Sequence, residues 1–161
     1  MNYKANTGFR TAGAAALAAW LTAGCAGVHT PQADASQAQI QRRLEEVFTA
    51  AESKDFARLD SYHLYGPKFT KFTGSSPGRL DAAAGRQGEH DGLGAAEGLR
   101  MRADALKIDV FDNVGIATFI LDYSFESGGK VVRRRDRSTL VFVKDAGQWK
   151  IAHEHLSPIS P

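Results

Sequence analysis

The stretch RSTLVFVKDAGQWKIAHEHLS, Arg137 to Ser157, holds two β-forming runs joined by a turn. The runs Ser138–Val143 and Trp149–Leu156 are rich in β-branched and aromatic residues, which is typical of strands. The segment Asp145–Gly147 suits a type I turn followed by a G1 bulge, with the glycine in the left-handed position. The stretch therefore predicts an antiparallel β-hairpin.

That turn would fix which residues of the two strands lie opposite one another. It pairs Val143 with Trp149, Val141 with Ile151, Thr139 with His153, and Arg137 with His155. Because side chains alternate along a strand, all of these would share one face, apolar near the turn and polar at the far end. We therefore expect the polar end, Arg137, Thr139, His153 and His155, to form a candidate ligand-binding group. We expect the apolar end to lie in the core or in a dimer interface.

The opposite face of the final strand carries Glu154. Asp122 and Glu126 lie together on one face of the run Val114–Glu126. If the Glu154 face is concave, Glu154 and Asp122 become the candidate acids of a pocket, and otherwise the two histidines take that role. Strand alternation alone does not decide between the two, because a β-bulge reverses it.

A metal site is another use for His153 and His155, with a third ligand from His63, His90 or Asp122. Zinc sites need three or four such ligands, and no second pair of closely spaced His or Cys supports one. We therefore predict no metal and no cofactor. The alternative interpretation makes the two histidines structural, with hydrogen bonds to neighbours such as Thr139.

The residues before the hairpin predict helices first and strands afterwards. Apolar residues recur at helical spacing after Ser36, and Asp55 can cap a shorter helix that follows. The segment from Gly74 to Gly94 predicts a long mobile loop, in which Glu89-His90-Asp91 is interpreted as exposed, and residues 95–101 predict a short helix. Four β runs complete the chain, Ala105–Phe111, Val114–Glu126, Lys130–Val143 and Gln148–Leu156. Their short connections make neighbours antiparallel, so the fold class is α+β.

The N-terminal segment has the pattern of a signal peptide. Lys4 and Arg10 precede an uncharged, Ala-rich run, residues 11–23, which is shorter than the roughly 20 residues that span a bilayer. The segment Leu21–Cys25 resembles a bacterial lipobox, although Thr22 stands where Leu is commonest. That resemblance implies a lipid anchor, with acyl chains such as palmitate, at Cys25, a signal peptide over 1–25, a tether over 26–35 and a domain over 36–158. Ordinary cleavage, with Cys25 removed or incidental, is the alternative.

Composition and charge restrict the classes of partner that this chain is expected to bind. Removing residues 1–25 deletes two cations from 20 Lys and Arg, so 18 remain against 18 Asp and Glu, and nucleic acid is not an expected partner. In lipoproteins resembling those of enteric bacteria, Ala26 favours an outer-membrane location facing the periplasm. A basic row, Arg133, Arg135 and Arg137, could meet an anion, a lipid headgroup or an acidic partner, and is otherwise a solvated half-strand.

The element order, ending in GQWKIAHEHLS at residues 147–157, resembles the NTF2-like superfamily. Within it, SnoaL-like domains often end in W-x-I-x-H-x-H-x-S, and Arg137–Thr139 also looks like that group. The association domain of calmodulin-dependent kinase II is similar at this strand, but Leu140 and Leu156 stand where that domain carries pocket arginines. The resemblance implies an NTF2-like cone, with N-terminal helices packed on a strongly curved antiparallel sheet, and commonly a homodimer through that sheet.

The resemblance does not imply one reaction, because such domains include isomerases, cyclases, dehydratases, hydrolases and non-catalytic modules. Our leading expectation is a membrane-anchored module of the cell envelope that binds a small or hydrophobic molecule, or a protein, without catalysis. The alternative is a cone-pocket enzyme that uses acid/base catalysis. A structural module with a filled core is the third reading.

Overall fold

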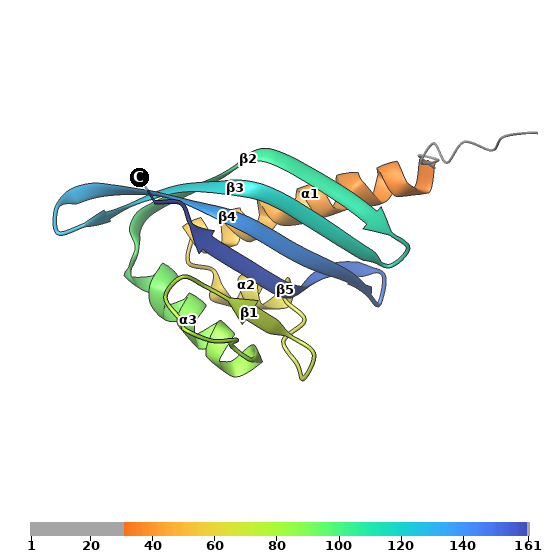
Figure 1. Ribbon diagram of the computed structural model, residues 1–161, viewed down its shortest axis with the longest axis horizontal. Coiled ribbons are helices and arrows are strands. Elements are labelled where there is room, and N and C mark those ends of the chain that lie inside the picture. The colour runs from red at the N-terminus through yellow and green to blue at the C-terminus, as the bar shows by residue number, and fades with distance from the viewer. Residues whose placement is uncertain (1–30, 161) are drawn as a thin grey trace, which may run out of the picture.

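The computed structural model describes residues 31–160, in which three helices and one five-stranded sheet follow one another (Figure 1). The elements are α1 (Pro31–Glu52), α2 (Phe56–Ser61), β1 (Thr70–Phe72), α3 (Ala82–Ala95), β2 (Glu97–Phe111), β3 (Val114–Ser127), β4 (Lys130–Asp145) and β5 (Gln148–Pro158). The strand order is β1-β5-β4-β3-β2, in which β1 runs parallel to β5 and the other neighbours are antiparallel. The predicted α+β class and the helices packed on a curved sheet are confirmed.

Helix α1 lies against the inner face of the sheet, and its apolar stripe forms much of the core. Ile40, Leu44 and Val47 are buried as their helical spacing predicts. Gly115 of β3 lets the helix approach closely, because a Cβ there would lie 2.2 Å from Ile40 Cδ1. None of the helices among residues 31–160 is long and apolar enough to span a membrane.

The N-terminal boundaries differ in part from the sequence-based prediction. Cys25, the signal peptide and the start of the tether lie outside the described residues. Residues 31–35, predicted as the end of the tether, are the first part of α1. Asp55 caps α2 as predicted, since its Oδ1 accepts a hydrogen bond from Arg58 N at 3.1 Å.

Two predictions in the middle of the chain are wrong. The predicted mobile loop 74–94 contains α3, whose N-cap Asp81 accepts a hydrogen bond from Ala84 N at 2.9 Å. The predicted short helix 95–101 is instead the start of β2, where Leu99 is buried. Four glycines obscure the helical pattern of α3, and pairing with β3 outweighs the local helix propensity of the second segment.

The hairpin of β4 and β5 forms, but its predicted register is wrong. Ala146 and Gly147 have φ of 45° and 80°, so the connection is a two-residue type I′ turn rather than a type I turn with a G1 bulge. A β-bulge then occurs on β5 at Ala152, between the pairs Phe142–Ile151 and Val141–His153. Beyond it, Thr139 lies opposite His155 and Arg137 opposite Ser157, so the predicted contacts are replaced.

The bulge decides which face of β5 points inward. Trp149 and Ile151 before it and Glu154 after it are all buried, with 3%, 0% and 5% exposure. His153 and His155 consequently lie on the outer face, where the first is partly buried and the second exposed. The Glu154 face is therefore the concave one.

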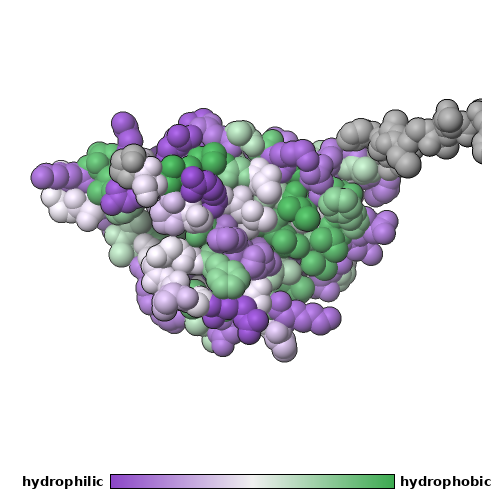
Figure 2. All heavy atoms as spheres, in the orientation of Figure 1, coloured by the Kyte–Doolittle hydropathy of each residue, from purple (hydrophilic) through white to green (hydrophobic). Residues whose placement is uncertain are grey.

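The predicted apolar group of the hairpin is divided between the two faces of the sheet. Trp149 and Ile151 are in the core, whereas Val141 and Val143 lie on the outer face opposite Ile116 and Val114 of β3. Figure 2 shows apolar atoms gathered on this face, over the part of the sheet near the turn that joins β2 and β3. The four outer residues, Val114, Ile116, Val141 and Val143, are called the outer apolar patch below.

Candidate functional site

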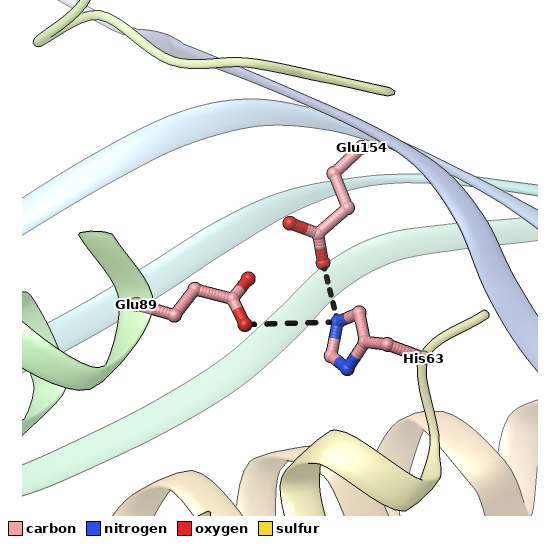
Figure 3. A group of neighbouring side chains, drawn as sticks. All are labelled: His63, Glu89 and Glu154. Atoms are coloured by element: carbon pink, nitrogen blue, oxygen red, sulfur yellow. Dashed lines mark hydrogen bonds and ion pairs between the residues drawn. The ribbon is translucent and has the colours of Figure 1, made fainter. Parts of the chain in front are cut away.

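Four ionisable side chains meet on the concave side of the sheet: His63, Lys71, Glu89 and Glu154. Only 1%, 8%, 11% and 7% of these side chains is exposed, respectively. Charged groups are seldom buried this deeply unless they are paired with one another. We call this group the buried quartet, and three of its members are drawn in Figure 3.

The quartet is held together by ion pairs. His63 Nε2 lies 3.0 Å from Glu154 Oε1 and 3.8 Å from Glu89 Oε2 (Figure 3). Lys71 Nζ forms ion pairs with both carboxylates, and the Tyr65 hydroxyl donates a hydrogen bond to Glu89 Oε2 at 2.7 Å. Each carboxylate therefore contacts both cations of the group.

Backbone pairing with β5 brings three members of the quartet together. Leu64 N donates to Ile151 O at 2.8 Å, which places the His63 segment beside the first half of β5. Strand β1 pairs with the second half, with Lys71 opposite Glu154. Reciprocal backbone bonds between Lys71 and Leu80, at 3.0 and 2.8 Å, turn the chain back towards α3. Glu89 then reaches the group from that helix.

The hydrogen bonds of His63 define its charge. Its Nδ1 lies 2.9 Å from the Leu59 carbonyl, which can only accept, so this nitrogen carries a proton. Its Nε2 faces two carboxylates and also acts as a donor. Burial opposes protonation, but the hydrogen bond and charge of Glu154 and the charge of Glu89 raise the pKa of His63 to about 9. The quartet therefore sets two cationic groups, His63 and Lys71, against two carboxyl groups.

The two carboxylates differ in their affinity for a proton. Burial raises the pKa of Glu89, and the neighbouring Glu154 charge adds to this effect. Burial acts in the same direction on Glu154, but Lys71 and His63 outweigh it and hold the pKa of Glu154 well below its ordinary value. The charges of the two carboxylates raise the pKa of Lys71 in spite of its burial. Glu89 is therefore the carboxylate of the quartet that takes up a proton first as the pH falls.

Helix α3, which carries Glu89, is attached to the domain by both polar and apolar contacts. Asp60 Oδ2 pairs with Arg86 Nη2 at 2.6 Å, Asp60 Oδ1 lies 2.9 Å from His90 Nε2, and the His90 ring stacks on Phe56 at 4.6 Å. Gly85 is the one buried residue of the helix, and its Cα approaches the ring of Phe69. Ala82 and Leu93 of α3 are partly buried and pack against the hydrophobic core, but the helix contributes no fully buried apolar side chain.

Of the two predicted acids, the structure brings only Glu154 into the cone. Asp122 lies on the outer face of β3, where its Oδ2 is 3.3 Å from Arg102 Nη2. Asp122 and Glu154 thus belong to opposite sides of the sheet. The Glu154 face is the concave one, and Asp122 does not lie on it.

The predicted polar group of the hairpin lies on the outer face. His153 Nδ1 is 2.8 Å from Thr70 Oγ1, so β1 supplies the hydroxyl that was expected from Thr139. The exposed His155 ring lies 5.9 Å from the ring of Phe72. Arg137 is exposed and Thr139 partly buried, so these four residues do not surround a common cavity in the cone.

The sequence analysis missed most of the quartet. His63 entered it only as an optional metal ligand, and Glu89 was assigned to an exposed loop. Lys71 was given no role. One signal was available, because a charged Lys71 between Thr70 and Phe72 must point to the opposite face from its neighbours and needs a buried partner if that face is concave.

The quartet also has the donor set of a metal site. One ligand atom each from His63, Glu89 and Glu154 lies within 4.8 Å of the others, and imidazole with carboxylates suits divalent cations such as zinc. The Lys71 ammonium group contacts the same two carboxylates. Lys71 already supplies a positive charge to both carboxylates, so a metal ion at this site would have to displace its ammonium group.

Two surface grooves of the domain lie away from the quartet. One, of about 250 Å³, is lined by α1 and the β4–β5 turn, including Arg43, Gln148 and Trp149. A second, of about 270 Å³, is lined by α1 and by Arg58 of α2. Because the quartet side chains are only 1–11% exposed, a ligand would reach them only after the elements that cover them had moved.

This arrangement of helices on a curved sheet around a polar interior is the NTF2-like fold. A proposed dehydratase of the NTF2-like family from Streptomyces avermitilis superposes with a TM-score of 0.71 at 17% identity, over 80% of this chain and 99% of that one. An NTF2-like superfamily protein from Salmonella enterica gives 0.70 at 16% identity, over 80% and 94%. The calmodulin-dependent kinase II association domain of C. elegans gives 0.67 at 16% identity, over 80% and 99%.

The family follows from the sequence itself. The SnoaL-like domain matches residues 40–161, and the chain belongs to this family. No curated protein matches the sequence.

Proposed function

We propose that this chain is a lipid-anchored SnoaL-like module of the cell envelope that binds a small organic acid at the buried quartet. The observation that carries the proposal is the position of Glu89. Its carboxylate, presented by a separate helix, receives Lys71, His63 and the Tyr65 hydroxyl. Glu89 thus occupies a carboxylate-binding position formed by the rest of the domain.

The charges of the remaining residues explain why a ligand acid would be recognised. If α3 moves away with Glu89, Lys71 and His63 face Glu154 alone and a net positive charge stays buried. An uncompensated buried charge costs several kcal/mol, about 3–5 when one partner is removed. A ligand carboxylate in the place of Glu89 removes this cost. Specificity for an acid over a neutral molecule follows directly.

The walls next to the quartet suit an apolar ligand body. The Tyr65 ring stacks on His63 at 4.8 Å, and Phe69 meets Tyr65 edge-on at 4.8 Å. Phe69 is fully buried, and its Cε1 lies near Gly85 of α3. Displacement of the helix would open these rings to a ligand, so an acid with a small aromatic or aliphatic body fits best.

Helix α3 has the properties of a movable cover. Four of its 14 residues are glycine, at positions 85, 88, 92 and 94. Each glycine in a helix interior costs about 0.5–1 kcal/mol relative to alanine. Because its apolar contacts come from partly buried residues such as Leu93, opening of α3 needs less free energy than opening of a helix packed through a fully buried apolar stripe.

The experiment is a chemical rescue. Glu89→Ala leaves the carboxylate position vacant, so sodium propionate should raise the melting temperature of this variant above that in equimolar sodium chloride. The same salt should have a smaller effect on the wild type, where Glu89 competes. It should have none on Glu89→Ala/Lys71→Met, which lacks the ammonium group. Equal effects on all three proteins would refute the carboxylate position.

Binding by the intact protein needs its own measurement. Benzoate titrated into the wild type should shift the ring signals of His63 in NMR spectra and speed amide exchange in residues 82–95, because α3 must open. Rescue of Glu89→Ala without these changes in the wild type would mean that the position is a structural ion cluster and not a binding site.

The enzyme alternative is favoured by one observation, the orientation of His63 between Leu59 O and Glu154 at 2.9 and 3.0 Å. A positioned imidazole is a common general base. Here both ring nitrogens donate hydrogen bonds, so no lone pair is free, and the low pKa of Glu154 makes it a weak base. Mass spectrometry after incubation distinguishes the cases, since a binding module returns the acid unchanged and an enzyme converts it.

The proposed assembly is a homodimer through the outer apolar patch. Val114 is 37% exposed, and Val141 and Val143 lie beside it on the outer face. Exposed apolar patches of this kind mark protein contacts. Light scattering should give twice the monomer mass for the wild type and a monomer for Val141→Lys. A monomeric wild type would exclude this assembly.

A further inference from the structure

The hairpin of β3 and β4 extends beyond the rest of the sheet. Strand β5 pairs with β4 only from Asp145 to Asp136, so residues 130–135 have β3 on one side and, within residues 31–160, no strand on the other. In Figure 1 this hairpin projects at the left, at the opposite end of the long axis from the start of α1. We call residues 130–135 the open edge of β4.

The open edge is strongly cationic. Residues 126–137 contain five cations and two carboxylates. One carboxylate, Asp136, is buried at 8% exposure, which leaves Glu126 as the acid on the surface. Arg135 lies 3.8 Å from Asp104, whereas Lys130, Arg133, Arg134 and Arg137 form no ion pair with any residue between 31 and 160.

The backbone of this edge is oriented for strand pairing. Arg135 O accepts a hydrogen bond from Ile159 N at 2.8 Å, so Arg135 directs its backbone groups away from β3. Because this direction alternates along a strand, Arg133 and Val131 direct their N–H and C=O groups to the same side. Val131 is also 64% exposed. The edge thus offers main-chain partners, cationic side chains and one apolar contact.

We propose that the open edge of β4 is a docking site for an extended acidic segment of another protein, which adds as a strand beside β4. Strand addition at a free edge uses the main chain for affinity and alternate side chains for specificity. Arg133 lies on the outer face of this edge, so an acidic residue of the added strand would lie across from it, and Arg135 and Arg137 continue the cationic row beside Ile159 and Ser157. This site is separate from the buried quartet and does not depend on its function.

Two other occupants fit the edge less well. A second copy of this chain would place like charges opposite one another. An anionic membrane offers charge but no backbone donors or acceptors, and the open edge lies far from the end of α1 to which the N-terminal segment connects (Figure 1). An acidic peptide satisfies both the charges and the backbone groups.

The test measures fluorescence anisotropy of a labelled peptide of alternating Glu and Thr with the full chain. Three comparisons test whether the peptide binds by adding as a strand. Arg133→Glu/Arg135→Glu should weaken binding by about tenfold or more through charge reversal. Val131→Pro should weaken it comparably, because it keeps every charge but removes one edge N–H. A peptide with alternate amides N-methylated should fail to bind.

The possible results of this experiment can be distinguished from one another. Circular dichroism spectra and melting temperatures of the variants must match the wild type, and Arg100→Glu on β2, which β3 separates from β4, serves as a folded charge control with little expected effect. Equal binding of the N-methylated peptide, or of Val131→Pro, would overturn strand addition. Absent binding at low salt would overturn the docking site. Binding to phosphatidylglycerol vesicles in place of the peptide would identify a lipid surface and overturn the proposal as well.

Discussion

Glu154→Gln is the most direct perturbation of the buried quartet, since it removes one carboxylate and keeps the shape of the side chain. Lys71 and His63 would then share Glu89 alone, and side chains that are only 1–11% exposed would hold a net positive charge. Removing one partner of a buried ion pair costs about 3–5 kcal/mol. Release of the His63 Nε2 proton relieves part of this cost, so we expect the free energy of unfolding to fall by about 3 kcal/mol.

Urea unfolding at pH 7, followed by far-ultraviolet circular dichroism, measures this change. Asp122→Asn is the matched control, because it removes a carboxylate from the outer face, where its partner Arg102 has a side-chain exposure of 64%. An exposed pair contributes about 0–1 kcal/mol, so this control should cost little. Asp122 and Glu154 belong to the same sheet, so the comparison of the two variants isolates the effect of burying the carboxylate.

The double variant Lys71→Met/Glu154→Gln tests whether charge balance is the cause. It leaves His63 and Glu89 as one cation and one anion, so its cost should be smaller than the sum of the single costs by about 1–3 kcal/mol. Two results would refute the reasoning. One is a Glu154→Gln cost no larger than that of Asp122→Asn, and the other is simple additivity of the two quartet substitutions.

Three further predictions concern the cover helix, the pH and the anchor. Gly88→Ala should stabilise the protein by about 0.5–1 kcal/mol because nothing lies within 4 Å of its added Cβ, whereas Gly85→Ala should destabilise it because the Cβ would lie 2.9 Å from Phe69 Cε1; urea unfolding measures both. The folded pKa of His63, about 9, exceeds its ordinary 6.5, so its stabilisation is complete below pH 6.5 and is lost as the pH rises through 9. That loss is on the order of 3 kcal/mol, and His63→Gln should lack it in thermal melts across this range. Cys25→Ser should abolish membrane partition and lipoprotein processing in cell fractionation, and unchanged partition would exclude lipidation.

The sequence was sufficient to predict the helices and strands in which apolar residues recur at a regular spacing. The stripe of α1 and the β-branched runs of β3, β4 and β5 predict their elements because burial on one face imposes the pattern. Helix α3 escaped prediction because its glycines lower local propensity and many of its contacts are polar, made by Arg86, Glu89 and His90. Such contacts leave no periodic apolar signal.

The candidate site was harder to predict than the fold, for two physical reasons. Its members come from four separate segments, and only β5 pairing brings His63 and Lys71 beside Glu154. Which face of β5 points inward also depended on two local features. One is a turn with Ala146 at positive φ, which is uncommon for a residue with a Cβ. The other is the bulge at Ala152, which has no sequence signature. Both events shifted the register, and together they moved the predicted histidines outside.

The bulge at Ala152 also bears on how this scaffold diversifies in evolution. Regular pairing through Ala152, without the bulge, would leave the Trp149–Ile151 half of β5 in place while rotating the remainder of the strand. His153 and His155 would then enter the interior and Glu154 would leave it. A homologue in which β5 pairs regularly at this position would carry an imidazole-lined cone on the same framework, so the pocket chemistry depends on one local feature of the backbone and not on a redesign of the core.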